Sequence, residues 1–271
     1  MIAPAALLVG VLFLLPIGRL FGMSLDYPNW TTAFFAGLFS SSVYVKSLWA
    51  TLRVSVFVVL GCLMFGYPIG YLLATCRAKL RPYLALTVLL PFWTSILVRN
   101  FAWMYLLQRH GTVNELLQSI GIIDQPLRLM FNEFGVVLGM TNALLPFMVL
   151  PIYVAIQSQD EAFLEAAGSL GAGPSVAFLK VTFPLSLPGI YAGTLLVFAT
   201  ALGFFVTPAL LGGGKVLVAA TYITYEIEIL LNWPGAAAAS IVLLGIILIV
   251  VAAYMRVVTI ERLSGADDAM A

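Results

Sequence analysis

Apolar residues along this chain gather in six long runs that are separated by shorter, more polar segments. A helix that crosses a bilayer needs about 20 mostly apolar residues, and each run is long enough. The runs cover approximately Ile2–Leu25, Ser47–Cys76, Tyr83–Gln108, Glu133–Gln157, Pro188–Leu211 and Gly235–Val258. No remaining stretch is long enough for a soluble domain. The pattern predicts an all-α polytopic membrane protein with about six transmembrane helices, forming one domain over residues 1–271.

Composition supports lipid as the main solvent of the chain. Hydrophobic residues make up 62% and charged residues 9%, whereas a soluble domain carries about 25% charged residues. The net charge of +1 provides no basic field for nucleic acid. Cys62 and Cys76 share one apolar run, and their spacing fits neither a zinc site nor a redox pair.

Basic residues in the short loops predict the orientation. The tightest cluster, Arg77, Lys79 and Arg81, lies between the second and third runs, and such clusters stay on the cytoplasmic side. Alternation of the runs then places residues 158–187 and both termini inside. The cations Lys46, Arg109, Arg128 and Lys215 fall outside. We expect a multi-pass membrane protein.

The segment of residues 158–187, called the elbow here, predicts two short helices. Ser158 and Glu161 are spaced as a capping box. Gly171 suits the left-handed position that ends a helix, and Pro174 suits the first position of the next one, which we expect to stop near Pro184. The first helix has one apolar face, at Phe163, Ala166, Ala167 and Leu170.

Small and acidic residues on this helix favour a protein partner. Ala166 and Ala167 let another surface approach closely, and Glu165 beside them can pair with a basic group. The alternative is an amphipathic loop that lies on the membrane, but such loops are usually basic. Asp160, Glu161 and Glu165 would face a leaflet that is itself negative.

The order of residues in the elbow resembles the cytoplasmic loop of binding-protein-dependent ABC importer permeases. The matching residues are Glu165-Ala166-Ala167, Gly171 and Val181-Thr182-Phe183-Pro184, although the family favours Ile and Leu at positions 181 and 183. Three further stretches resemble the spermidine/putrescine branch of that family. They are Pro91-Phe92-Trp93-Thr94-Ser95 with Arg99, Thr207-Pro208-Ala209-Leu210-Leu211-Gly212-Gly213-Gly214-Lys215, and Asn232-Trp233-Pro234.

The resemblance implies one half of an alternating-access importer, a multi-pass protein of the bacterial inner membrane. A second permease subunit, expected to be a different homologue, would complete the pathway, and a periplasmic binding protein would deliver the substrate. Two ATPase subunits, which hold the ATP and Mg²⁺, would grip the elbow. The implied substrate is a polyamine, with another small amine, an amino-acid-like solute or a phosphonate as the alternative. The implied coupling residues are Glu161, Phe163, Glu165, Ala166, Ala167, Leu170, Gly171 and Pro174.

Several residues are candidates for the substrate pathway. The ring faces of Phe92, Trp93, Phe204 and Phe205 are able to hold a cation, or they are plain packing. Arg99, with Asn100 beside it, lies inside a run and either lines the pathway or braces the partner subunit. Glu226 precedes the sixth run at the expected outer mouth, where it attracts a polyamine, binds the delivery protein or forms a solvated face.

Glycine pairs predict close helix contacts, and missing motifs argue against other functions. Gly66-x-x-x-Gly70, Gly135-x-x-x-Gly139 and Gly189-x-x-x-Gly193 permit close helix contacts. The run Gly212-Gly213-Gly214-Lys215 lacks the upstream glycine and the Ser/Thr of a phosphate loop, so we expect no ATP site, no metal site and no enzyme activity here. An ion-coupled secondary transporter would need carboxylates inside the runs, and none is evident.

Overall fold

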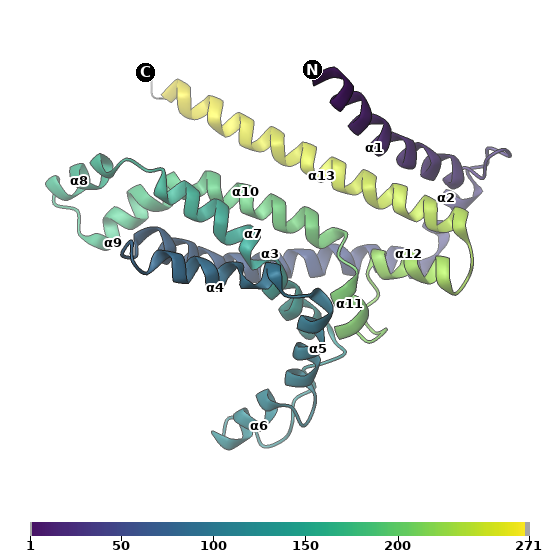
Figure 1. Ribbon diagram of the computed structural model, residues 1–271, viewed down its shortest axis with the longest axis horizontal. Coiled ribbons are helices and arrows are strands. Elements are labelled where there is room, and N and C mark those ends of the chain that lie inside the picture. Colours follow the sequence, from purple (N-terminus) through teal and green to yellow (C-terminus); the bar gives the residue numbers. More distant parts are fainter. Residues whose placement is uncertain (1, 269–271) are drawn as a thin grey trace. The chain divides into compact units, whose positions relative to one another are not determined.

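The structure is a computed structural model that describes residues 2–268. Side chains are described for residue 8 and residues 10–256. In this part of the chain every regular element is helical (Figure 1). The elements are α1 (Ile2–Ser24), α2 (Ala33–Ser40), α3 (Ser42–Thr75), α4 (Arg81–Trp93), α5 (Ile96–Leu107), α6 (Thr112–Ser119), α7 (Glu133–Gln157), α8 (Glu161–Ser169), α9 (Pro174–Ala177), the π-helical turn η1 (Phe178–Thr182), α10 (Phe183–Leu202), α11 (Val206–Leu211), α12 (Ala219–Glu228) and α13 (Trp233–Asp268).

Four helical stretches are long and apolar enough to cross a bilayer. They are α3, α7, the continuous stretch Pro174–Leu202 and the stretch Trp233–Arg256 of α13. The helix α4 and the following segment Ile96–Ser119 make a fifth span if the pair, bent by 99°, is counted as one. The first expected run forms α1, whose part with described side chains, Gly10–Ser24, is a shorter apolar helix. The expectation of an all-α polytopic membrane protein is confirmed.

Two expected spans are interrupted, each of them near a proline. The third run breaks at Thr94, which is extended (ψ 136°) three residues after Pro91. The fifth run stops at Leu202 and resumes as α11. Pro208 has no N–H with which to bond the carbonyl of Phe204, so one unbroken helix would leave that carbonyl unpaired.

The chain divides into two compact units. Unit 1 comprises Met1–Leu52 and Leu217–Ala253, and unit 2 comprises Arg53–Val216 and Tyr254–Ala271. In unit 1, Tyr44 and Tyr222 pack together with ring centroids 5.2 Å apart, and the Tyr44 hydroxyl donates to the carbonyl of Ala239 at 3.2 Å. A single permease domain over residues 1–271 stays a prediction.

Helix α7 is the centre of unit 2. In its apolar window 56% of residues are buried, against 39% or less in the other three long spans. Glycines bring its neighbours close. A Cβ added at Gly66 would lie 2.8 Å from Met148, and one added at Gly189 would lie 2.5 Å from the carbonyl oxygen of Pro151. The third expected pair, on α7 itself, does the same toward α11, since a Cβ added at Gly139 would lie 2.9 Å from Thr207. All three expected glycine pairs therefore serve contacts within unit 2.

Candidate functional site

Helix α8 begins at a different cap from the one that the sequence indicated. The N-cap is Asp160, whose side chain accepts a hydrogen bond from the Ala162 N–H at 3.0 Å. Ser158 instead ends α7, and its hydroxyl donates to the Ala155 carbonyl at 3.1 Å. The predicted Ser158–Glu161 capping box is wrong because α7 continues to Gln157. This leaves Asp160 as the extended residue before α8, and aspartate caps as well as serine does.

Helix α8 ends as predicted, at Gly171. This residue has φ +80°. Its N–H donates to the Gly168 carbonyl at 2.9 Å, and the Ala172 N–H donates to the Ala167 carbonyl at 3.0 Å. This pair of bonds is the Schellman motif, which satisfies the last carbonyls of a helix. The turn that follows α8 is therefore defined by backbone hydrogen bonds.

The second helix of the elbow begins as predicted but does not stop. Gly173 is the N-cap and Pro174 the first residue of α9. The expected end near Pro184 is wrong, since α9 continues through η1 into α10. In η1 the Phe183 N–H donates to the Phe178 carbonyl, five residues back. This wider turn makes room for the Pro184 ring, which would clash with a carbonyl in a regular helix.

One side-chain bond ties the start of the elbow to its end. Gln159 Nε2 donates to the Thr182 carbonyl at 3.1 Å. That bond joins the end of α7 to the start of α10, the two spans that carry the elbow. The two ends of the elbow are thus linked to each other directly.

The outward surface of α8 is exposed. None of its residues is buried. Phe163 is 57% exposed and Leu170, directly after the helix, is 88% exposed. The structure brings the eight predicted coupling residues together in one projecting element that lies beyond the ends of α7 and α10 (Figure 1).

Behind the elbow lies a cavity of about 760 Å³. Its walls come from the ends of α3 and α7, the start of α4 and the inward side of the elbow. They include Tyr71, Thr75, Cys76, Arg81, Gln157, Gln159, Glu161, Leu164, Pro174, Phe178 and Thr182. The basic loop that was predicted to lie inside thus adjoins the elbow, on the same side of unit 2.

Arg99 spans the break between α4 and α5. Its guanidinium donates to the Thr94 carbonyl at 3.0 Å, to the Thr94 hydroxyl at 3.1 Å and to the Pro91 carbonyl. The last carbonyls of a helix lack partners within it, and Arg99 supplies them. Phe92 packs edge-on against Phe147, with centroids 5.2 Å apart. Trp93 is 72% exposed.

Asn100 connects α5 to α11. It is buried, and its Oδ1 accepts a hydrogen bond from the Thr207 hydroxyl at 3.0 Å. Phe204 packs against the core of unit 2, whereas Phe205 is exposed. The sequence missed the Asn100–Thr207 bond because the two residues are 107 positions apart.

Glu226 is not at a solvated mouth. It is 5% exposed, and its carboxylate accepts hydrogen bonds from the Tyr222 hydroxyl and from Asn232 Nδ2, the latter at 2.8 Å. Burial raises the pKa of Tyr222, and the bond to Glu226 raises it further, so this hydroxyl stays a donor. The expected solvent-facing position of Glu226 is wrong because α12 packs this side against Tyr44. Its role in substrate passage stays a prediction.

No metal centre is found in the part of the chain with described side chains. No group of three or more His, Cys, Asp or Glu residues there is placed to hold an ion. What the described residues offer is a projecting helix, a bent span with exposed aromatic rings, and two cavities at the ends of unit 2.

Comparisons with known proteins agree with this arrangement. Residues 66–259 match the sequence family described as binding-protein-dependent transport system inner membrane component. The chain is 37% identical over 254 residues to the spermidine/putrescine transport system permease protein PotB of Haemophilus influenzae, covering 93% of this chain and 87% of that protein. It is 38% identical over 214 residues to PotB of Escherichia coli strain K12, covering 79% and 78%.

A solved structure shares the fold. A chain of a bacterial alginate ABC transporter, solved in complex with an alginate pentasaccharide-bound periplasmic protein, aligns with a TM-score of 0.77 at 23% identity. The alignment covers 94% of this chain and 91% of that one.

Proposed function

This chain belongs to the family of binding-protein-dependent transport system inner membrane components and is an ABC importer permease subunit, and from that premise we propose that it carries polyamines such as spermidine and putrescine. Support comes from the PotB relatives, which match over most of both chains. A permease for another small amine, an amino-acid-like solute or a phosphonate is the alternative.

The elbow is the element through which this permease is driven. The observation that carries this proposal is the unpartnered outward surface of α8, where Phe163 and Leu170 are exposed beside small alanines. Exposed apolar surface of this kind marks an interaction site. Two separate ATPase subunits, which bind ATP and Mg²⁺, receive α8, and the Gln159–Thr182 bond passes their motion to α7 and α10.

The elbow faces the cytoplasm. Support comes from the cavity wall that Arg81 shares with Glu161, because the Arg77–Lys79–Arg81 cluster belongs on the cytoplasmic side. The opposite end of unit 2 then faces the periplasmic binding protein. Both termini are cytoplasmic under this topology, and a second, different permease subunit completes the pathway.

Aromatic rings carry the cation past the bend. Glu133, at the start of α7, is not the partner that we propose for the cation. Its carboxylate is already paired with Arg53, with 2.7 Å between Oε2 and the arginine Nη2. Trp93 and Phe92 at the α4–α5 break are exposed, and ring faces attract ammonium groups. Arg99 is a positioning residue that holds this break, since its donors are directed at carbonyls of α4.

Uptake by a reconstituted transporter tests this function. The complete transporter is placed in liposomes, with ATP on the elbow side and the system's own binding protein on the other, and labelled spermidine is the probe. We expect uptake that requires ATP and the binding protein and that putrescine inhibits. Uptake driven by an ion gradient alone would contradict the ABC mechanism. ATP-dependent uptake that polyamines fail to inhibit would contradict the substrate.

A further inference from the structure

A second cavity, of about 420 Å³, lies at the end of unit 2 opposite the elbow. It is formed by residues 107–109 at the end of α5, residues 127–131 before α7, and Lys215 after α11. Residues 127–131 precede α7 and the elbow follows it. The 25 residues of α7 separate the two by about 37 Å at ~1.5 Å per residue. The two cavities are therefore at opposite ends of a membrane-spanning helix.

The walls of this cavity are held by specific bonds. Asn114 is fully buried and connects two of the walls. Its Oδ1 accepts from the Leu127 N–H at 2.9 Å, and its Nδ2 donates to the Gln108 carbonyl at 3.1 Å. Phe131, at φ +58°, donates its N–H to the Leu211 carbonyl at 2.9 Å. Gly213 leaves room for the Phe131 ring, because an added Cβ would lie 2.2 Å from it. These contacts connect the three wall segments to one another within the chain.

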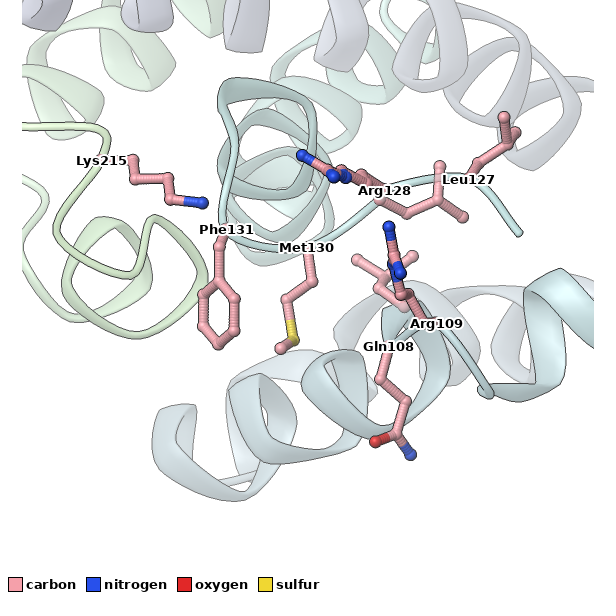
Figure 2. Close-up of a pocket in the computed structure, with 9 residues that line it drawn as sticks. Gln108, Arg109, Leu127, Arg128, Met130, Phe131 and Lys215 are labelled. Atoms are coloured by element: carbon pink, nitrogen blue, oxygen red, sulfur yellow. The ribbon is translucent and has the colours of Figure 1, made fainter. Parts of the chain in front are cut away.

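Three cations face this cavity, and no carboxylate lines it. Figure 2 shows Arg109 and Arg128 on one side of the cavity and Lys215 on the other, with the Lys215 amine directed toward the cavity. All three are exposed. Across the residues whose side chains are described, the one ion pair joins Arg53 to Glu133, so these cations have no internal counter-charge. The cavity is a focused positive field that repels polyamines and attracts anions.

We propose that this cavity is the docking site for an acidic side chain of the substrate-binding protein. The inference rests on the proposed function, which places this end of unit 2 outside the membrane. Cations on the outer side run against the usual distribution of Lys and Arg, so a binding requirement explains them better than topology does. An anionic lipid headgroup is the other source of such chemistry, but the negative surface potential belongs to the cytoplasmic leaflet.

Charge reversal tests the site in the assembled transporter. The triple variant R109E/R128E/K215E is compared with the single variant K46E, which reverses an exposed lysine of unit 1 that does not line the cavity. The probe is the system's spermidine-loaded binding protein, titrated onto transporter in phosphatidylcholine nanodiscs. We expect the triple variant to raise Kd about tenfold or more and to flatten its salt dependence, while K46E leaves Kd unchanged.

A neutral variant distinguishes the loss of positive charge from misfolding. R109Q/R128Q/K215Q removes the charges without introducing carboxylates, and we expect a smaller rise in Kd with an unchanged melting temperature. A Kd within about twofold of wild type in both triple variants would overturn the docking site. Wild-type uptake without any need for the binding protein would instead overturn the proposed function.

Lipid composition separates the two sources of anion. The same titration is repeated in nanodiscs that contain phosphatidylglycerol. A charge-reversal defect of equal size in both lipids supports a carboxylate of the binding protein. A defect that appears only with phosphatidylglycerol would identify a lipid headgroup and overturn the proposal.

Discussion

Gly171 is required for its backbone conformation and not for its small size. Its φ is +80°, yet a Cβ there would meet no atom within 4 Å. Gly168, three residues earlier within α8, also has open space but lies inside the helix. The same substitution should therefore have opposite effects at the two positions.

Alanine at the two glycines tests this difference. Gly171→Ala should weaken the end of α8 by about 1 kcal/mol, because a Cβ disfavours left-handed backbone. Gly168→Ala should strengthen α8 by up to about 1 kcal/mol through helix propensity. Hydrogen exchange at the Ala172 amide should become about fivefold faster in the first variant and no faster in the second. Equal exchange in both variants would contradict the Schellman motif.

Arg99 is the second residue whose role depends on its partners. Replacing it with glutamine removes the guanidinium bonds to the Pro91 and Thr94 carbonyls, of which Pro91 keeps the bond from the Thr94 hydroxyl. The loss should cost about 1 kcal/mol. We expect Arg99→Gln to lower the melting temperature of the purified transporter and its maximal uptake, with KM for spermidine unchanged. Arg77→Gln, at an exposed arginine of the adjacent loop, is the control. A change in KM alone would instead show direct contact with the substrate.

At the scale of elements, glycine positions decide how α7 and α10 pack. Gly189→Val should prevent their contact, because the added Cβ would lie 2.5 Å from the Pro151 carbonyl oxygen and 2.6 Å from Ala155. Gly245→Val on α13 is the matched control, since no atom lies within 4 Å of a Cβ there. We expect little monodisperse protein by size-exclusion chromatography for the first variant and a normal yield for the second. Normal yields for both would mean that the helices separate easily.

Prolines acted differently at two sites with similar local sequence signals. Pro184 was expected to end a helix, but the wider turn of η1 accommodates its ring and the helix continues. Near Pro91 the helix did break, and Arg99 pairs the carbonyls that the break exposed. A proline shows where a helical bond is missing. The fold decides whether the helix then widens, as at η1, or ends, as at Thr94.

At the scale of the whole molecule, sidedness can be measured directly. A cysteine at Leu170, which is 88% exposed, should react with a membrane-impermeant maleimide only in inverted vesicles. A cysteine at Ile122, which is 64% exposed, should react only in right-side-out vesicles, because α7 separates the two positions. Cys62 and Cys76 are replaced with serine in both variants.

Labelling with the same maleimide also tests whether the ATPase binds α8. Bound ATPase should protect position 170 from labelling and leave position 122 reactive. Labelling of both positions from one side would refute the topology. Unchanged labelling of position 170 in the assembled transporter would refute the docking of α8.

The sequence alone determined the membrane character, the approximate spans, the elbow with its Gly171 turn and the likeness to ABC importer permeases. Each follows from neighbours in the chain, since apolar run length, glycine conformation and motif spacing are local properties. Tertiary structure decided what depends on distant residues. It paired Asn100 with Thr207, turned Arg99 to the broken end of α4, and buried Glu226 beside Tyr222. It also gathered Arg109, Arg128 and Lys215 around one cavity, because only folding brings loops so far apart in sequence within reach of a shared anion.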